Sequence, residues 1–584
     1  MQFPAIVFFF ASVLSLRDSS AWFEESEVRK LLPSSTLIYV EAQSLSSILE
    51  HPFAKAVQDS AAFKKVLRAP DVVKLRGGIA LLEFALGEKA ESLLGSLTAN
   101  GVHLAYDKAT DGLVLLACSE SREWLDDYLQ KLVKLARTDA NLKNQGDPIR
   151  EAEYRGIHGY EFNKVIVGAI GSILLVTNKP DLGKNVIDRY LDSTEDHLHS
   201  NSQFQEAWTQ SDSPSEKAAS QTRIAELYVD LNAMRQAGIA KELLKGTARD
   251  FAGEVILGGV LAAIQKTSYM TSHLCLAESR LLLQAQVPYR KEWNAESREF
   301  FVGPGNAGLA LPLVDNSASM ASLIAYRNLS ELWLRAGDLF DQKVNDELAQ
   351  ADNTLTTLFS GKDFGSDILG AIEPQVQLIV FEQSFGTENI PAIQIPSFGL
   401  VAKLKNSAMK LELKRIFQSF VGFLNVAGAM EGKPQLDLDS ETVGVRQIYT
   451  ASFIQESDKK YPNGLPIQFN FSPSLAFEGD LVVMASTHSL AKSLVVQSAN
   501  QNLANESANT SLTVNMPSVK NALEANRLQL VSQNMLEKGH SKSQAEKEVE
   551  SLLSILSLFE RGSASLRFDD RVHVELDLEI RSGL

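Results

Sequence analysis

The chain has 584 residues, of which 45% are hydrophobic and 22% are charged, so it can bury substantial cores and should divide into two or more domains. Its formal net charge is −16, and no run of Lys and Arg stands out against the acidic excess. Because phosphate backbones are bound by clustered basic side chains, this composition disfavours a nucleic-acid partner.

The N-terminus carries a predicted export signal. Residues 4–16 form an apolar run of signal-peptide length, and small residues lead up to Ala21, where a signal peptidase would cut. We therefore expect residues 1–21 to be a signal peptide and the mature chain to be extracytoplasmic, whether secreted, periplasmic or at the cell surface. A retained anchor is the alternative, because Arg17 and Asp18 lie close to the cut. The run is short, however, for a hydrocarbon core that needs about twenty residues.

Two long amphipathic helices are predicted, one from about Arg122 and one from about Ser407, because apolar residues recur along one face of each at helical spacing. These residues are Trp124, Leu125, Tyr128, Leu129, Leu132 and Val133 in the first helix, and Met409, Leu413, Ile416, Phe417, Phe420, Val421 and Leu424 in the second. The strongest apolar stretches beyond the N-terminus, 251–264 and 416–430, are short and interrupted by polar residues. We expect them to be buried helices, and we expect no stable transmembrane span in the mature chain.

The chain has two cysteines, Cys118 and Cys275, each inside a strand-like segment. In an exported protein they could form a disulfide, but two buried thiols in different strands would look identical from the sequence. Neither has a Cys or His neighbour at metal-ligand spacing. We therefore name Cys118 and Cys275 as a possible disulfide and leave both alternatives open.

Residues 572–580 alternate between apolar and polar side chains, which predicts a strand with one buried and one solvated face. Asp569 and Asp570 supply turn chemistry, so residues 565–568 should be the other arm of a hairpin. Half-buried strands are typical of antiparallel sheets, because parallel strands are usually covered on both faces. The expected fold class is α+β, with an antiparallel or mixed sheet covered by amphipathic helices.

The chain also repeats itself. Residues 278–290 align without a gap with residues 569–581, at an offset of 291. Further landmarks recur in the same order, among them the strand and helix pattern of 227–237, which returns at 512–522. This order indicates an internal duplication into two similar halves, although two ordinary successions of strands and helices can also look alike.

The predicted domain boundaries follow the repeat. The first half should occupy residues 22–295 and the second half residues 309–584, joined by an inter-domain linker at 296–308. Each half contains a polar loop, at 197–222 or at 497–511, that is too poor in bulky apolar residues to order itself strongly.

The linker contains a pattern found in dinucleotide-binding loops, because Gly303 to Gly308 spells G-x-G-x-x-G. In such loops a helix opens at the third glycine. Here Gly308 leads into Leu-Ala-Leu-Pro-Leu, and no acidic residue stands at the expected strand end about twenty residues on. We therefore interpret the segment as a flexible linker and predict no nucleotide cofactor.

Other candidate clusters lack the context that their chemistry needs. The carboxylates and histidines at 195–199 could bind a metal, but they begin a polar loop. The acidic residues at 437–441 lack the glycine turn and distal Glu of an EF-hand. Ser407–Lys410 spells S-x-x-K without a companion motif, so we interpret the serine as a helix cap. The N-glycosylation sequons are at Asn328, Asn470, Asn505 and Asn509. We predict no metal site, and the sequence assigns no catalytic residue.

Several strand entries carry a weak family resemblance. Residues 36–41, 226–230 and 322–326, together with the strand and helix at 479–492, resemble large exported bacterial envelope proteins that carry domains of unknown function. The resemblance covers most of the chain and its motifs are structural. It implies an extracytoplasmic bacterial protein and carries over no functional residue.

Two classes of function remain. The favoured one is an exported, non-catalytic protein of the cell envelope that binds a protein partner or an apolar ligand, because half-solvated sheets faced by amphipathic helices form either a solid core or a groove. The alternative is an extracytoplasmic hydrolase whose catalytic groups come from distant positions. An apolar cavity would favour binding, whereas a pocket with convergent His and carboxylates would favour hydrolysis.

Overall fold

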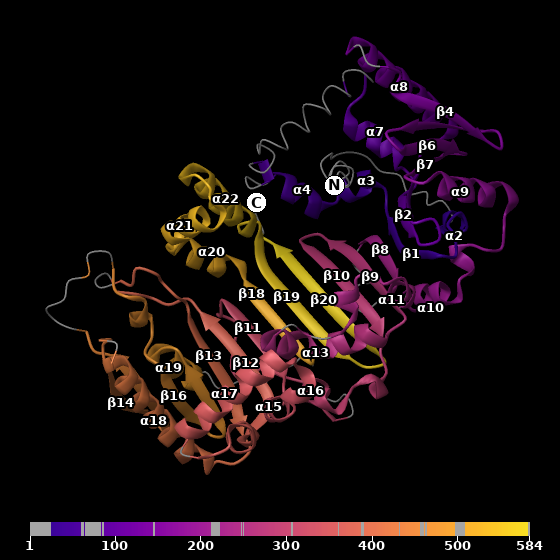
Figure 1. Ribbon diagram of the computed structural model, residues 1–584. Coiled ribbons are helices and arrows are strands. Elements are labelled where there is room, and N and C mark those ends of the chain that lie inside the picture. Colours follow the sequence, from indigo (N-terminus) through magenta and orange to yellow (C-terminus); the bar gives the residue numbers. More distant parts are fainter. Residues whose placement is uncertain are drawn as a thin grey trace. The chain divides into compact units, whose positions relative to one another are not determined.

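The computed structural model in Figure 1 describes most of the chain. The described residues are 25–59, 63–64, 83, 87–143, 146–211, 222–246, 248, 250–304, 308–359, 361–386, 390–430, 432–455, 461, 464–496 and 508–581. The expected signal peptide lies outside them, as do parts of both polar loops.

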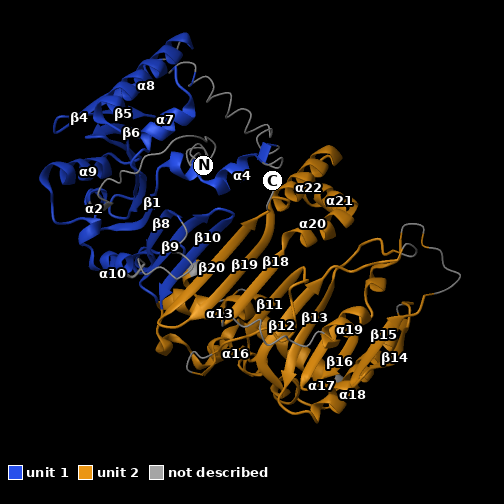
Figure 2. Ribbon diagram, turned by 180° about the vertical axis from the view of Figure 1, so that it is seen from behind, with its two compact units in different colours: residues 1–241, 267–288, 582–584 blue, residues 242–266, 289–581 orange. Residues whose placement is uncertain are grey.

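The chain divides into two compact units, coloured separately in Figure 2. Unit 1 comprises residues 1–241, 267–288 and 582–584, and unit 2 comprises residues 242–266 and 289–581. Each unit combines antiparallel strands with helices, so the predicted α+β class is confirmed.

Unit 1 is built on antiparallel strands. They are β1 (Thr36–Ala42), β2 (Val102–Asp107), β3 (Gly112–Cys118), β4 (Ile149–Tyr154), β5 (Ile157–Phe162), β6 (Val165–Ile170), β7 (Ile173–Thr177), β8 (Thr222–Asp230), β9 (Tyr269–Ala277) and β10 (Arg280–Pro288). Their order across the sheet is β10-β9-β8-β1-β2-β3-β7-β6-β5-β4.

Helices cover both faces of this sheet. They are α2 (Glu25–Arg29), α3 (Leu45–Glu50), α4 (Pro52–Asp59), α7 (Ala90–Leu97), α8 (Arg122–Leu142), α9 (Pro180–Asp192), η1 (Leu198–Ser200), α10 (Ser202–Ser211) and α11 (Leu231–Ala237). Successive side chains of a strand point to opposite faces. Leu116 of β3 therefore packs into one core with α9 and α10, whereas Ala117 packs into a second core with α7 and α8.

Unit 2 is also built on antiparallel strands. They are β11 (Ala321–Tyr326), β12 (Ile372–Phe381), β13 (Ser397–Leu404), β14 (Leu436–Val443), β15 (Arg446–Phe453), β16 (Ser474–Glu478), β17 (Leu481–Ala485), β18 (Thr510–Asn515), β19 (Phe559–Phe568) and β20 (Arg571–Ile580). Their order is β20-β19-β18-β11-β12-β13-β17-β16-β15-β14. The strand predicted at 572–580 and its hairpin partner are thus confirmed as β20 and β19.

The unit 2 sheet is covered in the same way. Its helices are α12 (Lys241–Leu244, which starts in unit 1), α13 (Phe251–Lys266), η3 (Lys291–Trp293), η4 (Glu296–Arg298), α14 (Glu299–Val302), α15 (Leu329–Leu334), α16 (Ala336–Leu339), α17 (Gln342–Leu358), η6 (Phe364–Ile368), η7 (Leu369–Ala371), α18 (Met409–Met430), η8 (Ile467–Asn470), α19 (His488–Val496), α20 (Met516–Ala525), α21 (Arg527–Lys538) and α22 (Lys542–Leu556). Val401 of β13 packs with α19, and the adjacent Ala402 packs with α18 on the other face.

The two units pair their strands in the same order. Replacing β1–β10 by β11–β20 converts one order into the other. The long helix between the third and fourth strands is α8 in unit 1 and α18 in unit 2, and the helix after the seventh strand is α9 or α19. An internal duplication predicts this shared order.

The described part of the segment 296–308 is not the flexible linker that its glycines and proline predicted. It forms η4 and α14, and Phe300, Phe301 and Val302 are buried within unit 2. Burial of each of these three apolar side chains contributes about 1.5–3 kcal/mol, which favours a packed segment over a solvated linker.

Residues 242–266 also depart from the expected boundaries, because they belong to unit 2 and not to the first half. In α13 an added Cβ at Gly259 would lie 2.5 Å from the ring of Phe301 and 2.9 Å from that of Phe568. Glycine at this position therefore lets the helix pack closely against α14 and β19.

The two apolar stretches that were expected to be buried helices are helices, but not fully buried ones. Both Ile256 and Leu257 of α13 are exposed, as are several apolar side chains of α18. In the part of the chain that the structure describes, no helix combines the length and apolarity needed to cross a membrane.

Candidate ligand-binding groove

The first predicted amphipathic helix, α8, is fixed at its start and along one face. The Ser121 hydroxyl accepts a hydrogen bond from the backbone N of Trp124 (3.2 Å), which caps the N-terminus. Leu125 and Leu129 are then buried against β3, β6 and β7. Beyond Leu129, the apolar side chains of the helix other than Ala140 are only partly covered, so its second half presents an incompletely buried face.

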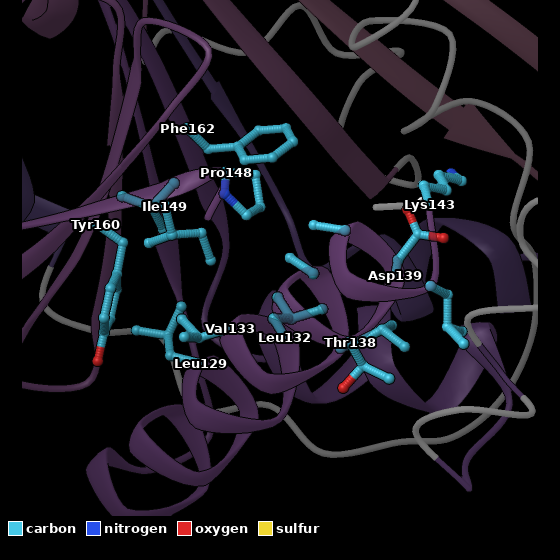
Figure 3. Close-up of a pocket in the computed structure, with 15 residues that line it drawn as sticks. Leu129, Leu132, Val133, Thr138, Asp139, Lys143, Pro148, Ile149, Tyr160 and Phe162 are labelled. Carbon is cyan, nitrogen blue, oxygen red and sulfur yellow. Dashed lines mark hydrogen bonds and ion pairs between the residues drawn. The ribbon is translucent and has the colours of Figure 1, made fainter. Parts of the chain in front are cut away.

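A groove of about 640 Å³ lies between this half of α8 and strands β4–β6. Its apolar lining comprises Leu129, Leu132, Val133, Leu135 and Ala136 from the helix, and Pro148, Ile149, Tyr160, Phe162 and Val167 from the strands and the turn before them. Figure 3 shows Tyr160, Ile149 and Phe162 across from Leu129, Leu132 and Val133. Its volume falls in the range of about 300–1,000 Å³ that is typical of small-molecule sites.

The charges that line the groove form a single ion pair. The Asp139 carboxylate and the Lys143 ammonium lie 2.7 Å apart, one helical turn from each other at the end of α8. The Thr138 hydroxyl donates to the backbone oxygen of Lys134 (2.8 Å). No histidine occurs among the described lining residues, and one carboxylate paired with lysine offers no acid–base pair. Apart from these groups and the Tyr160 hydroxyl, the described lining is apolar, as is typical of ligand-binding sites.

The mouth of the groove leaves large apolar side chains in water. Leu142 is 80% exposed and Phe162 is 43% exposed. Single exposed apolar residues are common on protein surfaces, but these two continue the lining of the groove. Such a continuous apolar surface usually marks a site of interaction.

Unit 1 also contains a buried polar cluster, centred on Glu41 of β1. Arg29 donates to the Glu41 carboxylate through Nε (3.0 Å) and Nη2 (2.9 Å). The Tyr39 hydroxyl donates to the same carboxylate (2.6 Å) and lies 2.8 Å from Nδ1 of His103. Arg29 also stacks on the ring of Trp208, with the guanidinium carbon 4.2 Å from the ring centroid.

This cluster holds the sheet and α2 together and has the features of a structural network. Burial, with a smaller contribution from Arg29, lowers the pKa of His103 to about 3, so the ring is neutral near pH 7. Tyr39 belongs to the core beneath α9 and α10, whereas Leu129 of the groove belongs to the core on the opposite face. His103 and Glu41, the histidine and carboxylate that a hydrolase could use, therefore do not line the groove.

The possible disulfide between Cys118 and Cys275 is not formed, because both are buried free thiols. Cys118 is in β3 and Cys275 is in β9, with β2, β1 and β8 between them. At about 4.8 Å per strand the two lie about 19 Å apart, and a disulfide needs Cα atoms within about 7 Å. Burial, followed by the charge of Glu41, raises the pKa of Cys118 to about 12, which suppresses its thiolate.

In the G-x-G-x-x-G segment, the described glycines Gly303 and Gly308 pack closely against another side chain. An added Cβ at Gly303 would lie 3.0 Å from the Tyr326 ring, and one at Gly308 would lie 2.7 Å from the same ring. The glycines thus admit an aromatic side chain. Residues 305–307 lie outside the described residues.

The acidic and histidine clusters also have structural partners. His197 caps η1 by accepting a hydrogen bond from the backbone N of Ser200 (2.9 Å), and Arg189 pairs with Asp196 (3.1 Å). A hydrogen bond from Lys492, with the charge of His488, lowers the pKa of Glu441. Within the described ranges, no three or more His, Cys, Asp or Glu side chains come together in a group that could hold a metal ion.

The asparagines of three of the four sequons have structural roles. Asn328 caps α15, and Asn470 and Asn509 are buried. Asn509 donates to the backbone oxygens of Phe301 (2.7 Å) and Gly308 (3.1 Å) and accepts from the buried Arg327 (3.0 Å). Asn505 lies outside the described residues.

Sequence reasoning identified the helix but missed the groove. The sequence feature that could have predicted the groove is the width of the apolar stripe on α8. This stripe includes Leu135, Ala136 and Leu142 as well as Leu132 and Val133. A stripe wider than one buried face predicts a second contact surface.

Comparisons with known proteins identify no family. No family model matches, and no curated protein matches. Among solved structures, crystal forms IV, I and III of TP0453 align with 9%, 10% and 10% identity. They cover 44%, 45% and 49% of this chain and 79%, 78% and 88% of their own chains, with TM-scores of 0.23, 0.24 and 0.24. Likeness at this level carries no argument about fold or function.

Proposed function

We propose that this protein is exported and binds an apolar ligand in the groove beneath α8, without catalysing a reaction on it. The observation that carries the proposal is the apolar lining of the groove, with its one charged pair, Asp139 and Lys143, neutralised internally. A ligand with an unbranched acyl chain fits this chemistry, because its chain matches the apolar walls and its polar end can remain in water at the mouth.

Burial of such a chain is energetically sufficient. Each methylene removed from water contributes about 0.8 kcal/mol, so about ten methylenes contribute about 8 kcal/mol before the costs of ordering the ligand. Association costs at least about 4 kcal/mol, so a chain of about fifteen methylenes, which contributes about 12 kcal/mol, leaves about 8 kcal/mol, the value of a micromolar dissociation constant. No hydrogen bond to the chain is required, which agrees with the scarcity of polar groups in the lining.

A substitution that fills the groove with a bulky side chain tests whether the ligand binds there. Ala136 lines it from α8, and in Ala136→Trp the indole would occupy the space of the ligand. With cis-parinaric acid, a fatty acid whose fluorescence rises when its chain leaves water, we expect the dissociation constant to rise about tenfold or more, which is about 1.4 kcal/mol or more. Fluorescence titration of the purified protein measures this.

The matched control is Ala349→Trp, which places the same side chain on an exposed helical position of α17. Its affinity should equal that of the wild type. If both variants bind cis-parinaric acid as tightly as the wild type, the ligand occupies another site. If the wild type shows no saturable binding, the groove is not an acyl-chain site, and a protein partner becomes the favoured occupant.

Export rests on the apolar run at 4–16 and the small residues up to Ala21. We expect the mature chain to begin at Trp22. Edman sequencing of the protein purified from its own cells measures this directly. A chain that still begins at Met1 or Gln2 would contradict cleavage.

The internal duplication is likewise a proposal. Its support is the common strand order of the two units and the matching positions of α8 with α18 and α9 with α19. Under this proposal α8 and α18 descend from one helix, and the groove is a specialisation of the first copy.

A further inference from the structure

The groove beside α8 is closed at one end and open at the other. Along the helix, the exposed fraction of the leucines rises from 0% at Leu125 and 6% at Leu129 to 80% at Leu142. On the strand side Val167 lines the groove, whereas Ala169, two residues further along β6 and on the same face, is buried in the core with Leu125 and Leu129. This core therefore closes the groove beside Leu129, and Leu142 stands at its open mouth.

The length of the groove follows from the helix that forms its wall. Leu142 stands 13 residues after Leu129 (142 minus 129), within the single helix α8. At about 1.5 Å per residue, the two positions are about 20 Å apart. A saturated carbon chain with bonds of about 1.5 Å and angles of about 111° advances about 1.25 Å per carbon. An extended chain of about sixteen carbons therefore reaches from Leu129 to the mouth, where Figure 3 shows Lys143 at the end opposite Leu129.

The floor of the groove is held in place by the sheet. Tyr160 is paired with Val167, and Phe162 with Ile149, in adjacent antiparallel strands, so all four side chains lie on the face that α8 covers. The backbone ladder joins these strands and opposes any widening of the floor between them. A ligand is therefore accommodated lengthwise between the helix and the floor.

The two ends of a bound chain meet different surroundings. At the closed end Leu129, Val167 and Ala169 offer no hydrogen-bond partner from their side chains, and a charged or polar group buried there without a partner is strongly disfavoured. At the mouth a polar head can stay in water beside the paired Asp139 and Lys143. The apolar end of the chain therefore enters first.

We propose that the α8 groove selects a single straight-chain amphiphile of about sixteen carbons. Its methyl end lies against Leu129 and Val167, and its polar head stays in water beside Leu142. This inference rests on the apolar-ligand function proposed above and adds the length and the direction of the chain. Leu129 and Val167 are the residues that set the length limit.

A series of saturated fatty acids tests the length. In displacement of cis-parinaric acid from the full-length wild-type protein, each methylene that enters the groove should tighten binding about fourfold, the equivalent of about 0.8 kcal/mol. Dodecanoic, tetradecanoic and hexadecanoic acids should therefore bind about fifteenfold more tightly at each step. Eicosanoic acid should gain less than about threefold over hexadecanoic acid, because its additional methylenes remain in water at the mouth.

A second carboxylate tests the direction. Hexadecanedioic acid matches hexadecanoic acid in length, but it would place an ionised carboxylate against Leu129 and Val167. It should displace cis-parinaric acid about a hundredfold less well, because that charge has no partner at the closed end. Equal displacement by the two acids would show that both ends of the groove are open to water and would overturn the proposed direction.

A shorter side chain at the closed end should move the length limit. Val167→Ala removes two carbons from the end wall at a partly buried position, and octadecanoic acid should then bind about fourfold or more tighter than hexadecanoic acid. In the wild type these two acids should bind almost equally. The matched control Val376→Ala, at a partly buried strand position of unit 2, should keep the wild-type limit.

The outcomes separate this inference from the function on which it rests. If cis-parinaric acid shows no saturable binding to the wild type, both are overturned. If it binds saturably but the gain in affinity continues undiminished to eicosanoic acid, or Val167→Ala leaves the limit unshifted, only the selection by length is overturned.

Discussion

Glu254→Ala should lower the free energy of unfolding of unit 2 by about 3–5 kcal/mol. Glu254 of α13 has no solvent-exposed side-chain surface, and its carboxylate accepts hydrogen bonds from Nε (2.7 Å) and Nη2 (3.1 Å) of Arg298. Arg298 also donates to the backbone oxygen of Gly246 (2.8 Å). Removal of the carboxylate leaves a buried guanidinium charge without its counter-ion, and this uncompensated charge is the main cost.

The comparison variant is Glu546→Ala in α22, whose carboxylate forms an exposed pair with Lys542 (3.9 Å). Exposed pairs contribute at most about 1 kcal/mol, so this change should be small. Guanidinium-induced unfolding followed by circular dichroism measures both variants. Equal losses in the two would show that Glu254 and Arg298 do not form the buried pair described above.

Unit 1 should lose stability as the pH falls from about 6.5 towards 3, and His103→Gln should remove much of this loss. His103 has a pKa of about 3 in the folded protein and about 6.5 when unfolded. Between these values the unfolded chain binds a proton that the folded chain does not, so the free energy of unfolding falls with decreasing pH. Each unit of pKa difference corresponds to about 1.4 kcal/mol, so the expected loss is a few kcal/mol.

Other ionisable groups lie around His103, so the effect of this histidine on stability must be isolated with the His103→Gln variant. Arg29, Tyr39 and Glu41 face it in the cluster, and Glu226 lies beside Glu41 on β8. Burial raises the pKa of Glu226, so that carboxyl stabilises the fold at low pH and acts against the effect of His103. Urea unfolding at pH 7, 6, 5 and 4 should therefore be compared between the wild type and His103→Gln. Parallel curves would contradict a neutral, buried His103.

The sequence predicted those features that depend on local periodicity. Alternation in 572–580 located a strand, and helical spacing after Arg122 and before Leu424 located α8 and α18, because burial on one face imposes these periods directly. The recurrence of local patterns predicted that the two halves would share one order of strands, and the two units do share it, although their common descent remains a proposal. The segment 296–308 was assigned wrongly because its three glycines and one proline were given more weight than the adjacent Phe300 and Phe301.

The candidate site depended on information that no local pattern carries. Whether Leu132 and Val133 become core or the wall of a groove depends on how far β4–β6 extend beneath α8, which is set by tertiary packing. The pairs of Arg29 with Glu41 and of Arg298 with Glu254 join distant positions, and an isolated Arg or Glu in the sequence gives no indication of its partner.

The buried position of Asn509 bears on how the protein should be produced. Its side chain holds the backbone of Phe301 and Gly308 and contacts Arg327, so it leaves no room for a sugar. The oligosaccharyltransferase of a eukaryotic host modifies chains before they fold and recognises the short Asn509-Thr510-Ser511 motif without regard to later burial. A glycan attached there would prevent these contacts from forming. A bacterial expression host, which does not attach such glycans, is therefore the better source of correctly folded material.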